Sequence, residues 1–271
     1  MNKDINNTAN LNSDGLSFFR KNSKAYADSE SHKSGDDLSV LVERLPAGDG
    51  MNALDVATGT GFTAFRLAQT YKLVVGLDVT GEMMQEARNI STEKKLDNIL
   101  YVLGRSERMP FLDHTFDVVT CRRAAHHFTD REGFIREVRR VLRPEGTFGF
   151  VDMVSPADDI NDSFNELERL RDPTHLFAGS KMFWENAVSK AGFTITFSQI
   201  LSERISFKKW LSPVSPEDDS GIKCRIYLNN NENLKKILSF HDDTMIKTRL
   251  VLTATCSDKN ESCIDFLGLL S

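Results

Sequence analysis

The chain has 271 residues, of which 40% are hydrophobic and 27% are charged, and its formal net charge is −5. This composition is typical of a soluble globular protein, and the length is ample for a packed core without stabilising disulfides or metal. The longest apolar runs, near residues 53–57 and 72–77, are far shorter than the ~20 residues that span a bilayer, so we expect no membrane span. The acidic balance argues against a nucleic-acid partner, since proteins that bind phosphate backbones usually carry a basic excess.

The N-terminal stretch 1–12 is polar and rich in asparagine. It lacks the apolar segment of a signal peptide, so we expect it to be disordered and the protein to be cytoplasmic. The cysteines form no C-x-x-C pair and have no histidine at zinc-ligand spacing, which predicts reduced thiols and no metal site. These cysteines are Cys121, Cys224, Cys256 and Cys263.

Two helices are expected next, at 14–28 and from Ser34 to Leu45, each with apolar residues at helical spacing. From residue 51 to residue 154, short apolar runs alternate with amphipathic stretches. This pattern predicts strands at 51–56, 72–77, 98–103, 116–121 and 147–154, and helices at 62–70, 80–95 and 130–142. The alternation indicates an open α/β sheet whose parallel strands are connected by helices. Ligands of such sheets bind beyond the carboxyl ends of the strands, so the turn after the first strand is the first candidate site.

The chain after residue 154 gives weaker signals. We expect helices at 159–170, 180–191 and 231–240, strands at 193–201 and 245–256, and an acidic, proline-containing loop at 213–221. No linker in this half marks a second domain.

The turn after the first strand has the sequence LDVATGTGFTA (54–64) and is rich in small residues that let a ligand approach the backbone. Gly59, Gly61 and Ala64 match the dinucleotide fingerprint G-x-G-x-x-G/A. Asp55 argues against a dinucleotide, because a carboxylate at the strand end would repel a pyrophosphate; its other interpretation is a helix cap. It suits S-adenosylmethionine, which carries a sulfonium and an ammonium group and no phosphate. Asp78 ends the next strand, where it can accept hydrogen bonds from ribose hydroxyls of either ligand.

Four stretches carry a family resemblance: LDVATGTG (54–61), VVGLDVT (74–80), ERMPFLDHTFDVVTCRRAAHHF (107–128) and FIREVRRVLRPEGTFGFVD (134–152). They resemble class I S-adenosylmethionine-dependent methyltransferases, in particular the ubiquinone and menaquinone biosynthesis C-methyltransferase branch and its small-molecule relatives with an AAHHF stretch. The resemblance covers roughly residues 15–205. It implies an α/β, Rossmann-like, seven-stranded and mostly parallel sheet with helices on both faces, whose last strand, at 245–256, runs antiparallel. It also implies one methyltransferase domain over 13–271, with N-terminal cap helices at 13–45 and a lid insertion at about 156–190.

The resemblance implies S-adenosylmethionine as cofactor and S-adenosylhomocysteine as product. The residues implied for the methionine end are Asp55, Ala57, Thr58, Gly59, Gly61, Cys121 and Arg122. Asp78 would hold the ribose hydroxyls, and Val79 and Met83 would lie against the adenine.

One position departs from the family pattern. Relatives have Gly-Asp-Ala-Glu after the third strand, where the aspartate meets the adenine amino group, whereas this chain has Gly104-Arg105-Ser106-Glu107. Arginine cannot accept a hydrogen bond, so the adenine would rely on the Ser106 hydroxyl and on backbone groups. Losing a charged acceptor costs about 1.5–3 kcal/mol. Alternatively, Arg105 pairs with an acidic ligand or an acidic neighbour.

Candidate bases follow the fourth strand and the fifth. Histidine titrates near neutrality, and an acceptor with a hydroxyl or an acidic carbon needs a base. We expect His126 to face the acceptor and His127 to be structural, with a purely structural pair as the alternative. His175, in the sequence RDPTH (171–175), is a further candidate base or acceptor ligand, or else a turn residue.

The acceptor pocket is expected to include Phe18, Phe19, Tyr26 and Asp152. Many apolar residues between 164 and 184 favour a small apolar or aromatic acceptor that is methylated on carbon or oxygen. Those residues could equally pack the core of a lid or a dimer contact, and either a monomer or a homodimer is compatible with the sequence.

The sequence also bears on three other functions. Base-amine methyltransferases of nucleic acids usually carry an Asn/Asp-Pro-Pro-aromatic stretch after the fourth strand, and residues 121–127 lack one. A protein of this fold could also bind the cofactor and catalyse non-methylating chemistry such as cyclisation, which the Arg105 departure keeps open. A non-catalytic binding subunit is disfavoured because the cofactor turn is intact.

Overall fold

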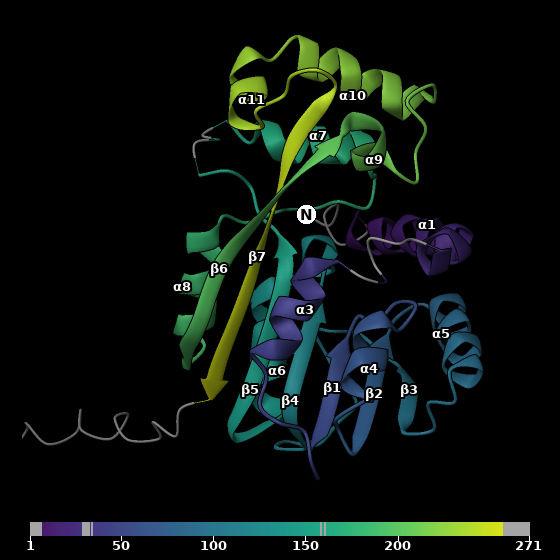
Figure 1. Cartoon of the computed structure of the whole chain (residues 1–271), viewed down its shortest axis with the longest axis vertical. Helices are drawn as coiled ribbons and strands as arrows, with labels where there is room; N and C mark the ends of the chain where they lie inside the picture. The colour runs from purple at the N-terminus through teal and green to yellow at the C-terminus, as the bar shows by residue number, and fades with distance from the viewer. Residues whose placement is uncertain (1–6, 29–32, 34, 158, 160, 257–271) are drawn as a thin grey trace, which may run out of the picture.

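The computed structural model describes residues 7–28, 33, 35–157, 159 and 161–256, and all structural statements refer to these residues. Seven strands form one sheet in the order β3-β2-β1-β4-β5-β7-β6 (Figure 1). The strands are β1 (Asn52–Val56), β2 (Leu73–Asp78), β3 (Ile99–Leu103), β4 (Phe116–Arg122), β5 (Leu142–Met153), β6 (Phe193–Ser206) and β7 (Thr244–Cys256). The first five run parallel, whereas β7 lies antiparallel between β5 and β6. The predicted Rossmann-like sheet with an antiparallel last strand is therefore confirmed.

Helices cover both faces of the sheet, which explains why the central strands are apolar along nearly their whole length. The helices are α3 (Asp36–Glu43), α4 (Phe62–Leu67), α5 (Gly81–Glu93), α6 (Arg131–Val141) and α8 (Lys181–Lys190). On one face α6 and α8 pack on the sheet through Phe134 and Trp184, and on the other α3 and α4 pack through Leu41 and Phe65.

Helix α6 illustrates how the local sequence sets an element. Asp130 caps its N-terminus by accepting a hydrogen bond from the amide of Gly133 at 2.7 Å. Phe134, Val138 and Val141 recur at helical spacing and are fully buried against the sheet. Strand β5 begins at Leu142, five residues earlier than the sequence predicts. Only Leu142 and the residues from Thr147 onward pair with β4, so Pro144 and Gly146 lie in an irregular stretch near the start of the strand, where the register shifts.

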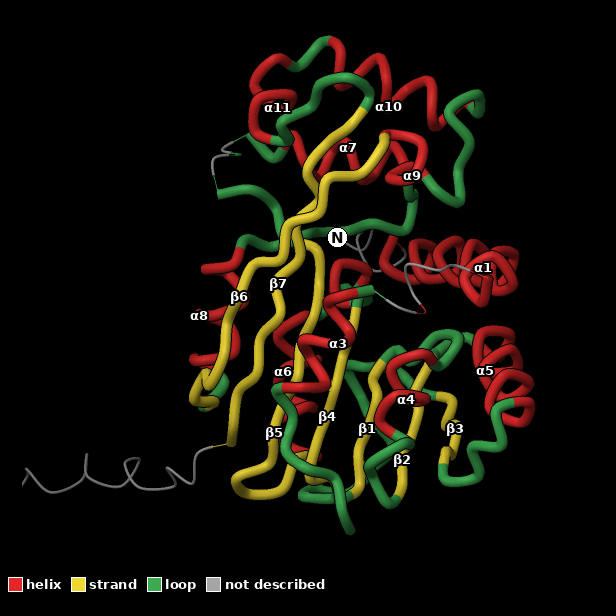
Figure 2. The backbone as a smooth tube through the Cα atoms, in the orientation of Figure 1, coloured by secondary structure: helices red, strands yellow, loops and turns green. Residues whose placement is uncertain are grey.

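A separate layer of helices, which we call the cap, lies beyond the carboxyl ends of the parallel strands (Figures 1 and 2). It consists of α7 (Ser163–Arg171), α9 (Phe207–Leu211), α10 (Asp219–Asn229) and α11 (Glu232–Ile237). Strands β6 and β7 extend past the end of β5 and carry these helices. The cap has its own apolar core, in which Phe164 and Leu167 of α7 meet Trp210 of α9 and Leu228 of α10.

The segment expected as a lid, 156–190, is divided in the structure. Helix α7 belongs to the cap, but α8 packs on the sheet, where the ring centroids of Trp184 and Phe150 are 4.6 Å apart. The cap also contains α9 and α10, which the sequence pattern did not predict. Helix α10 buries only Gly221, Cys224 and Leu228, and this stripe is too weak to stand out from an acidic loop.

Helix α1 (Asn7–Asp28) lies beside α5 and under the cap (Figure 1). It includes the later part of the stretch 1–12 that we expected to be disordered, and residues 1–6 lie outside the described residues. Within the described part of the chain, no helix combines the length and apolar character needed to cross a membrane.

Candidate functional site

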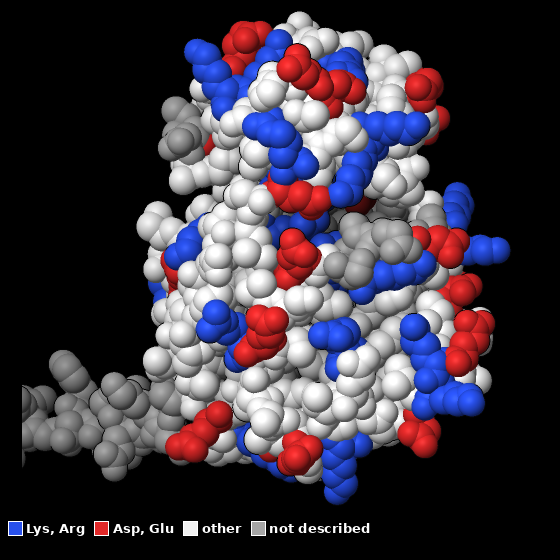
Figure 3. Space-filling view, in the orientation of Figure 1, with Lys and Arg blue, Asp and Glu red and all other residues white. Residues whose placement is uncertain are grey.

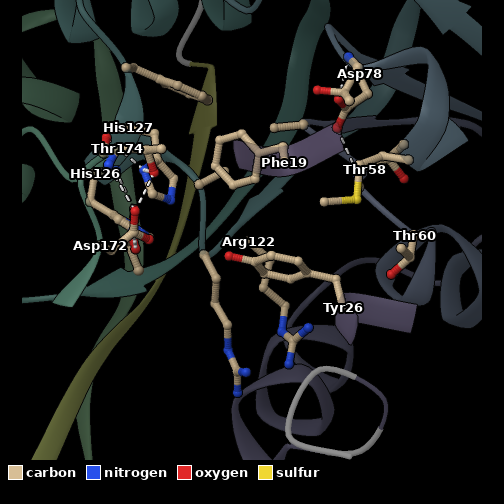
Figure 4. Close-up of a pocket in the computed structure, with 18 of the residues that line it drawn as sticks. Phe19, Tyr26, Thr58, Thr60, Asp78, Arg122, His126, His127, Asp172 and Thr174 are labelled. Carbon is tan, nitrogen blue, oxygen red and sulfur yellow. Dashed lines mark hydrogen bonds and ion pairs between the residues drawn. The ribbon is translucent and has the colours of Figure 1, made fainter. Parts of the chain in front are cut away.

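A cavity of about 620 Å³ lies between the carboxyl ends of the strands, helix α1 and the cap. Its size falls within the ~300–1,000 Å³ that small-molecule sites occupy. Strand order reverses between β1 and β4, and the cavity opens at that point, where an α/β sheet is expected to bind its ligand. Figure 4 shows Thr58, Thr60 and Asp78 on one side of this cavity, His126 and His127 on the other, and Phe19 between them.

The glycine turn forms one wall through left-handed backbone. Ala57 has φ 54°, Gly59 has φ 54° and Gly61 has φ 92°. A Cβ on Gly59 would meet open space, so its backbone can lie directly against a ligand. A Cβ on Gly61 would come within 2.6 Å of the Phe65 ring. Gly61 therefore permits the turn to enter α4 and, contrary to our expectation, does not line the cavity.

Asp55 lies beneath the turn and does not line the cavity. Its Oδ2 accepts a hydrogen bond from the Thr58 hydroxyl at 2.7 Å, and its Oδ1 accepts one from the Thr120 hydroxyl at 2.8 Å. Burial raises the pKa of the carboxyl group to about 6. Asp55 thus fixes the turn from behind, and its contact with the methionine end stays a prediction. The same holds for Cys121, whose fully buried side chain belongs to the core.

Asp78 lines the cavity at the end of β2. Its Oδ2 accepts a hydrogen bond from the amide of Gly59 at 2.8 Å, and its Oδ1 accepts one from the amide of Thr80 at 2.8 Å. A carboxylate oxygen has two lone pairs, so each oxygen can still accept a ribose hydroxyl. Val79 and Met83 flank this carboxylate in the cavity wall.

The segment after β3 contributes Gly104, Arg105 and Ser106 to the same wall. The guanidinium of Arg105 is half exposed, and its Nε lies 3.7 Å from Oε2 of Glu107. Of the two alternatives left by the sequence, an acidic ligand or an acidic neighbour, the structure thus provides the neighbour.

Across the cavity, His126 is held by Asp152 at the end of β5. Nδ1 of His126 lies 2.6 Å from Oδ1 of Asp152, and the backbone amide of His126 donates to Oδ2 at 2.9 Å. Burial lowers the pKa of His126 well below its usual value and raises the pKa of Asp152 to about 6. At neutral pH the imidazole is therefore neutral and Asp152 is ionised. Because Nδ1 bonds to Asp152, Nε2 is the nitrogen left for a ligand.

His127 also lines the cavity, which a regular strand would not allow for two adjacent residues. The 3-10 turn Ala125–His127 brings the two rings to a centroid distance of 4.0 Å. Nδ1 of His127 lies 3.0 Å from both the carbonyl oxygen and the hydroxyl of Thr174, and that hydroxyl donates to Asp172 at 2.6 Å (Figure 4). The edge of the Phe19 ring packs against His127, with centroids 5.0 Å apart.

His175 lies behind this wall and does not line the cavity. Its Nε2 is 2.7 Å from Oδ1 of Asn165, and its buried Nδ1 has no hydrogen-bond partner among the described residues. Burial, followed by the nearby His126, lowers its pKa to about 3. This placement favours the alternative in which His175 is a turn residue, since its amide donates to the carbonyl oxygen of Asp172, and its role as base or acceptor ligand stays a prediction. The ring lies 5.6 Å from that of His126 and supports it from behind.

The acceptor pocket differs from expectation in its apolar residues. Phe19 and Tyr26 line the cavity, whereas Phe18 does not. The apolar residues between 164 and 184 that favoured an apolar acceptor also lie elsewhere: Phe164 is in the cap core and Trp184 in the sheet core. They correspond to the alternative in which these residues pack a core.

The cavity also contains a group of basic residues, of which the sequence analysis had selected Arg122 but not its neighbours in the fold. Arg122 and Arg123 both bind Asp37 of α3, with shortest distances of 3.1 and 2.7 Å. Although burial alone would raise the pKa of Asp37, the two guanidinium groups hold it well below its usual range. Further lining residues are Arg171, Asp172, Lys209, Lys247 and Arg249. They lie far apart in the chain, so only the folded cap brings them together.

Comparison with known proteins agrees with this site. A methyltransferase-domain family model matches residues 54–150, the stretch from β1 to β5. The uncharacterized methyltransferase YcgJ of Bacillus subtilis is 34% identical over 213 residues, which are 78% of this chain and 84% of that protein. The solved structure of a putative methyltransferase from Bacillus halodurans has a TM-score of 0.76 at 29% identity and covers 82% of this chain and 100% of its own.

A third relative covers a shorter stretch. The ubiquinone/menaquinone biosynthesis C-methyltransferase UbiE of Hahella chejuensis is 34% identical over 115 residues, which are 41% of this chain and 46% of that protein. The sheet topology, the glycine turn with Asp78 and the extent of the YcgJ match agree. The chain therefore belongs to the class I S-adenosylmethionine-dependent methyltransferases.

Proposed function

We propose that the chain binds S-adenosylmethionine across the ends of β1 to β3 and transfers its methyl group to a small molecule on the side of His126. The observation that carries this proposal is the continuity of one cavity, whose walls include both Asp78 and the His126–Asp152 pair. When bound, the cofactor would supply an electrophilic methyl group, and the protein would have to align the acceptor with it.

The cofactor wall is suited to a ligand without phosphate. The open space at Gly59 would admit the methionine end, and the two Asp78 oxygens would accept the ribose hydroxyls. The adenine would lie between Met83 and the segment around Ser106. The amide of Gly59 already donates to Asp78 and is not free for a pyrophosphate, which speaks against a dinucleotide.

His126 would act as the general base for an acceptor with an acidic hydroxyl or carbon. Its neutral ring has Nδ1 bonded to Asp152, so Nε2 is the nitrogen able to accept a proton. The negative charge of Asp152 would stabilise the imidazolium that forms and keep the ring in one orientation. The cap would limit the access of water to this side.

For the acceptor, an aromatic molecule methylated on carbon or oxygen remains our proposal, on different grounds from the sequence. Phe19, Tyr26, Phe128 and Trp210 line the cavity and offer aromatic surfaces for ring packing. The Hahella chejuensis relative is a ubiquinone/menaquinone biosynthesis C-methyltransferase, which is consistent with an aromatic acceptor.

Calorimetric titration of the full chain with S-adenosylmethionine, S-adenosylhomocysteine and NAD tests the cofactor. We expect binding of the first two only. Asp78→Asn should weaken that binding, and the matched surface variant Asp97→Asn should not. Tight binding of NAD alone would contradict the proposal.

Methyl transfer needs a separate readout. An acceptor screen monitored by mass spectrometry should show S-adenosylhomocysteine accumulating in equal amount with a methylated product. If an acceptor is converted by the cofactor-loaded protein while no S-adenosylhomocysteine forms, the chemistry is not methyl transfer, and the cyclisation alternative takes its place.

A further inference from the structure

Two basic residues of β7 project toward the acceptor side of the cavity. Lys247 and Arg249 are two positions apart on one strand, so their side chains share a face, and both line the cavity. Arg249 pairs with Met153, the last residue of β5, and Lys247 lies beyond that point on the part of β7 that pairs only with β6. These side chains therefore lie where the sheet meets the cap.

The protein provides little negative charge for this pair. Among the residues that the structure describes, no carboxylate lies within 4 Å of the Lys247 ammonium, which also makes no hydrogen bond. Arg249 is 3.8 Å from Glu203, and the same carboxylate already binds Lys209 at 2.6 Å. Largely enclosed cations are usually paired with a carboxylate. Lys247 has no such partner in the described part of the chain, and Arg249 shares its carboxylate with Lys209.

Neighbouring cations add further positive charge around Lys247 and Arg249. Arg171 of α7 is held by Glu168 at 2.6 Å, and Arg123 shares Asp37 with a second arginine. Burial, followed by repulsion from Arg249 and Arg171, lowers the pKa of Lys247 to about 7. Burial and the charge of Arg123 lower the pKa of Arg249 to about 10. The face shown in Figure 3 carries basic and acidic side chains interspersed, in contrast to this part of the cavity wall.

The cofactor is not the missing partner. Its expected contacts lie at the ends of β1, β2 and β3, and β7 is three strands away from β1 in the sheet. At 4.7–4.9 Å between strands, that separation is about 14 Å. Lys247 and Arg249 lie on the opposite side of β4 and β5 from the cofactor wall, on the side where the proposed function puts the acceptor.

From this juxtaposition we infer that the acceptor carries an anionic group, a carboxylate or a phosphate, and that Lys247 and Arg249 bind it. This inference rests on the proposed function and deepens it by naming the acceptor's charge. The planar guanidinium of Arg249 can donate two parallel hydrogen bonds to such a group, and the ammonium of Lys247 adds a point charge. The aromatic surfaces at Phe19 and Tyr26 would hold the remainder of the molecule.

The test uses the full chain saturated with S-adenosylhomocysteine and three ring compounds of similar size. Benzoate and phenyl phosphate carry the two candidate groups, and benzamide is the neutral counterpart of benzoate. Dissociation constants would be measured by ligand-observed NMR titration for the native chain, for Lys247→Met and Arg249→Gln, and for the surface control Lys208→Met. Lys208 is exposed and does not line the cavity.

We expect at least one anion to bind about tenfold or more tightly than benzamide, because a charged hydrogen bond is worth that much. Each cavity variant should weaken the anion by about tenfold while leaving S-adenosylhomocysteine affinity, benzamide binding and the melting temperature close to native. Lys208→Met should behave like the native chain. A preference for benzoate or for phenyl phosphate identifies the group.

Two results would overturn the inference: benzamide binding as tightly as both anions, or anion binding that is unchanged in both cavity variants. Failure of the proposed function is a distinct outcome, because it appears as loss of S-adenosylhomocysteine binding in the native chain before any probe is added.

Discussion

The two sides of the cavity are built differently. The cofactor side consists of the glycine turn, Asp78 and the segment around Ser106, which lie within about fifty residues of one another in sequence and offer mainly backbone groups. The acceptor side consists of His126, Asp152 and the basic residues of α7 and β7, and it offers side chains from segments as far apart as β4 and β7. A cofactor common to a whole family can be held by the shape of the backbone, whereas a particular acceptor needs its own side chains.

The largest expected effect concerns the base. His126→Ala should reduce kcat by about 10²–10⁴-fold, the usual contribution of general acid–base catalysis, and leave cofactor affinity unchanged. Steady-state formation of S-adenosylhomocysteine with a converted acceptor measures the first, and calorimetry the second. Asp152→Asn should lower kcat as well, since it removes the charge that stabilises the imidazolium, and the exposed His241→Ala should have no effect.

The same kinetic measurement also distinguishes the roles of the two adjacent histidines. If His127→Ala rather than His126→Ala abolished turnover, the base would be the ring held by Thr174, and the roles that we assign would be exchanged.

The next largest effect is expected from a substitution on the cofactor side of the cavity. Asp78→Ala should raise the dissociation constant of S-adenosylmethionine by about 10–100-fold, because it removes a charged acceptor worth about 1.5–3 kcal/mol. It also frees the amides of Gly59 and Thr80, so part of the loss comes from a less ordered turn. Binding of benzoate or phenyl phosphate should change little. Loss of both ligands together would contradict the division of the cavity into two independent sides.

The same division explains what the sequence predicted. The turn, Asp78 and the alternation of strands with helices are local patterns, and the structure places them as predicted. The contacts of Asp55 are of another kind: its position at the end of β1 is visible in the sequence, but the hydroxyls of Thr58 and Thr120 that bind it are not. The proximity of Thr120 depends on the pairing of β4 with β1, which no local pattern reveals.

On the acceptor side, sequence reasoning selected the histidines and Asp152, but not the contact between His126 and Asp152 or the basic residues of β7. Lys247 and Arg249 occur in an alternating strand in which charged residues usually face solvent. Only the extension of β6 and β7 beyond β5, together with the helices that they carry, encloses these two positions. The apolar stretch around Trp184 favoured an apolar acceptor in the sequence analysis, but Trp184 packs in the sheet core.

A smaller effect follows from the pKa of Lys247, which lies near 7. The affinity for benzoate, which stays fully ionised in this range, should fall by up to about tenfold as the pH rises from 6 to 8.5, since the ammonium of Lys247 loses its proton. The charged groups facing Lys247 are Arg249 on β7, Glu203 on β6, Arg171 and Glu168 on α7, and Arg123 after β4. Because Lys247 has a pKa of about 7, Lys247→Met should show a smaller change of benzoate affinity over this range than the native chain.

The lowered pKa of Lys247 should also affect the free energy of unfolding, with the opposite dependence on pH. The lowered pKa means that the unfolded chain binds more protons than the folded chain between about pH 7 and pH 10. This difference should make the free energy of unfolding rise with pH in that window. Denaturant unfolding at several pH values should show this slope for the native chain and a smaller slope for Lys247→Met. Equal slopes would mean that Lys247 keeps an ordinary pKa.

The smallest expected effect is at Arg105, where the cofactor side departs from its family pattern. The side chain is half exposed and its only described carboxylate within 4 Å is that of Glu107, so the pair contributes little to stability. Arg105→Asp would restore an acceptor for the adenine amino group but bring a carboxylate close to Glu107. We therefore expect the dissociation constant of S-adenosylmethionine to decrease by no more than about tenfold. Arg108→Asp, which makes the same charge change at an exposed position outside the cavity, is the calorimetric control. If Arg105→Asp weakened binding tenfold or more while the control did not, the guanidinium itself would be a ligand of the cofactor, and this side would also depend on a side chain peculiar to this chain.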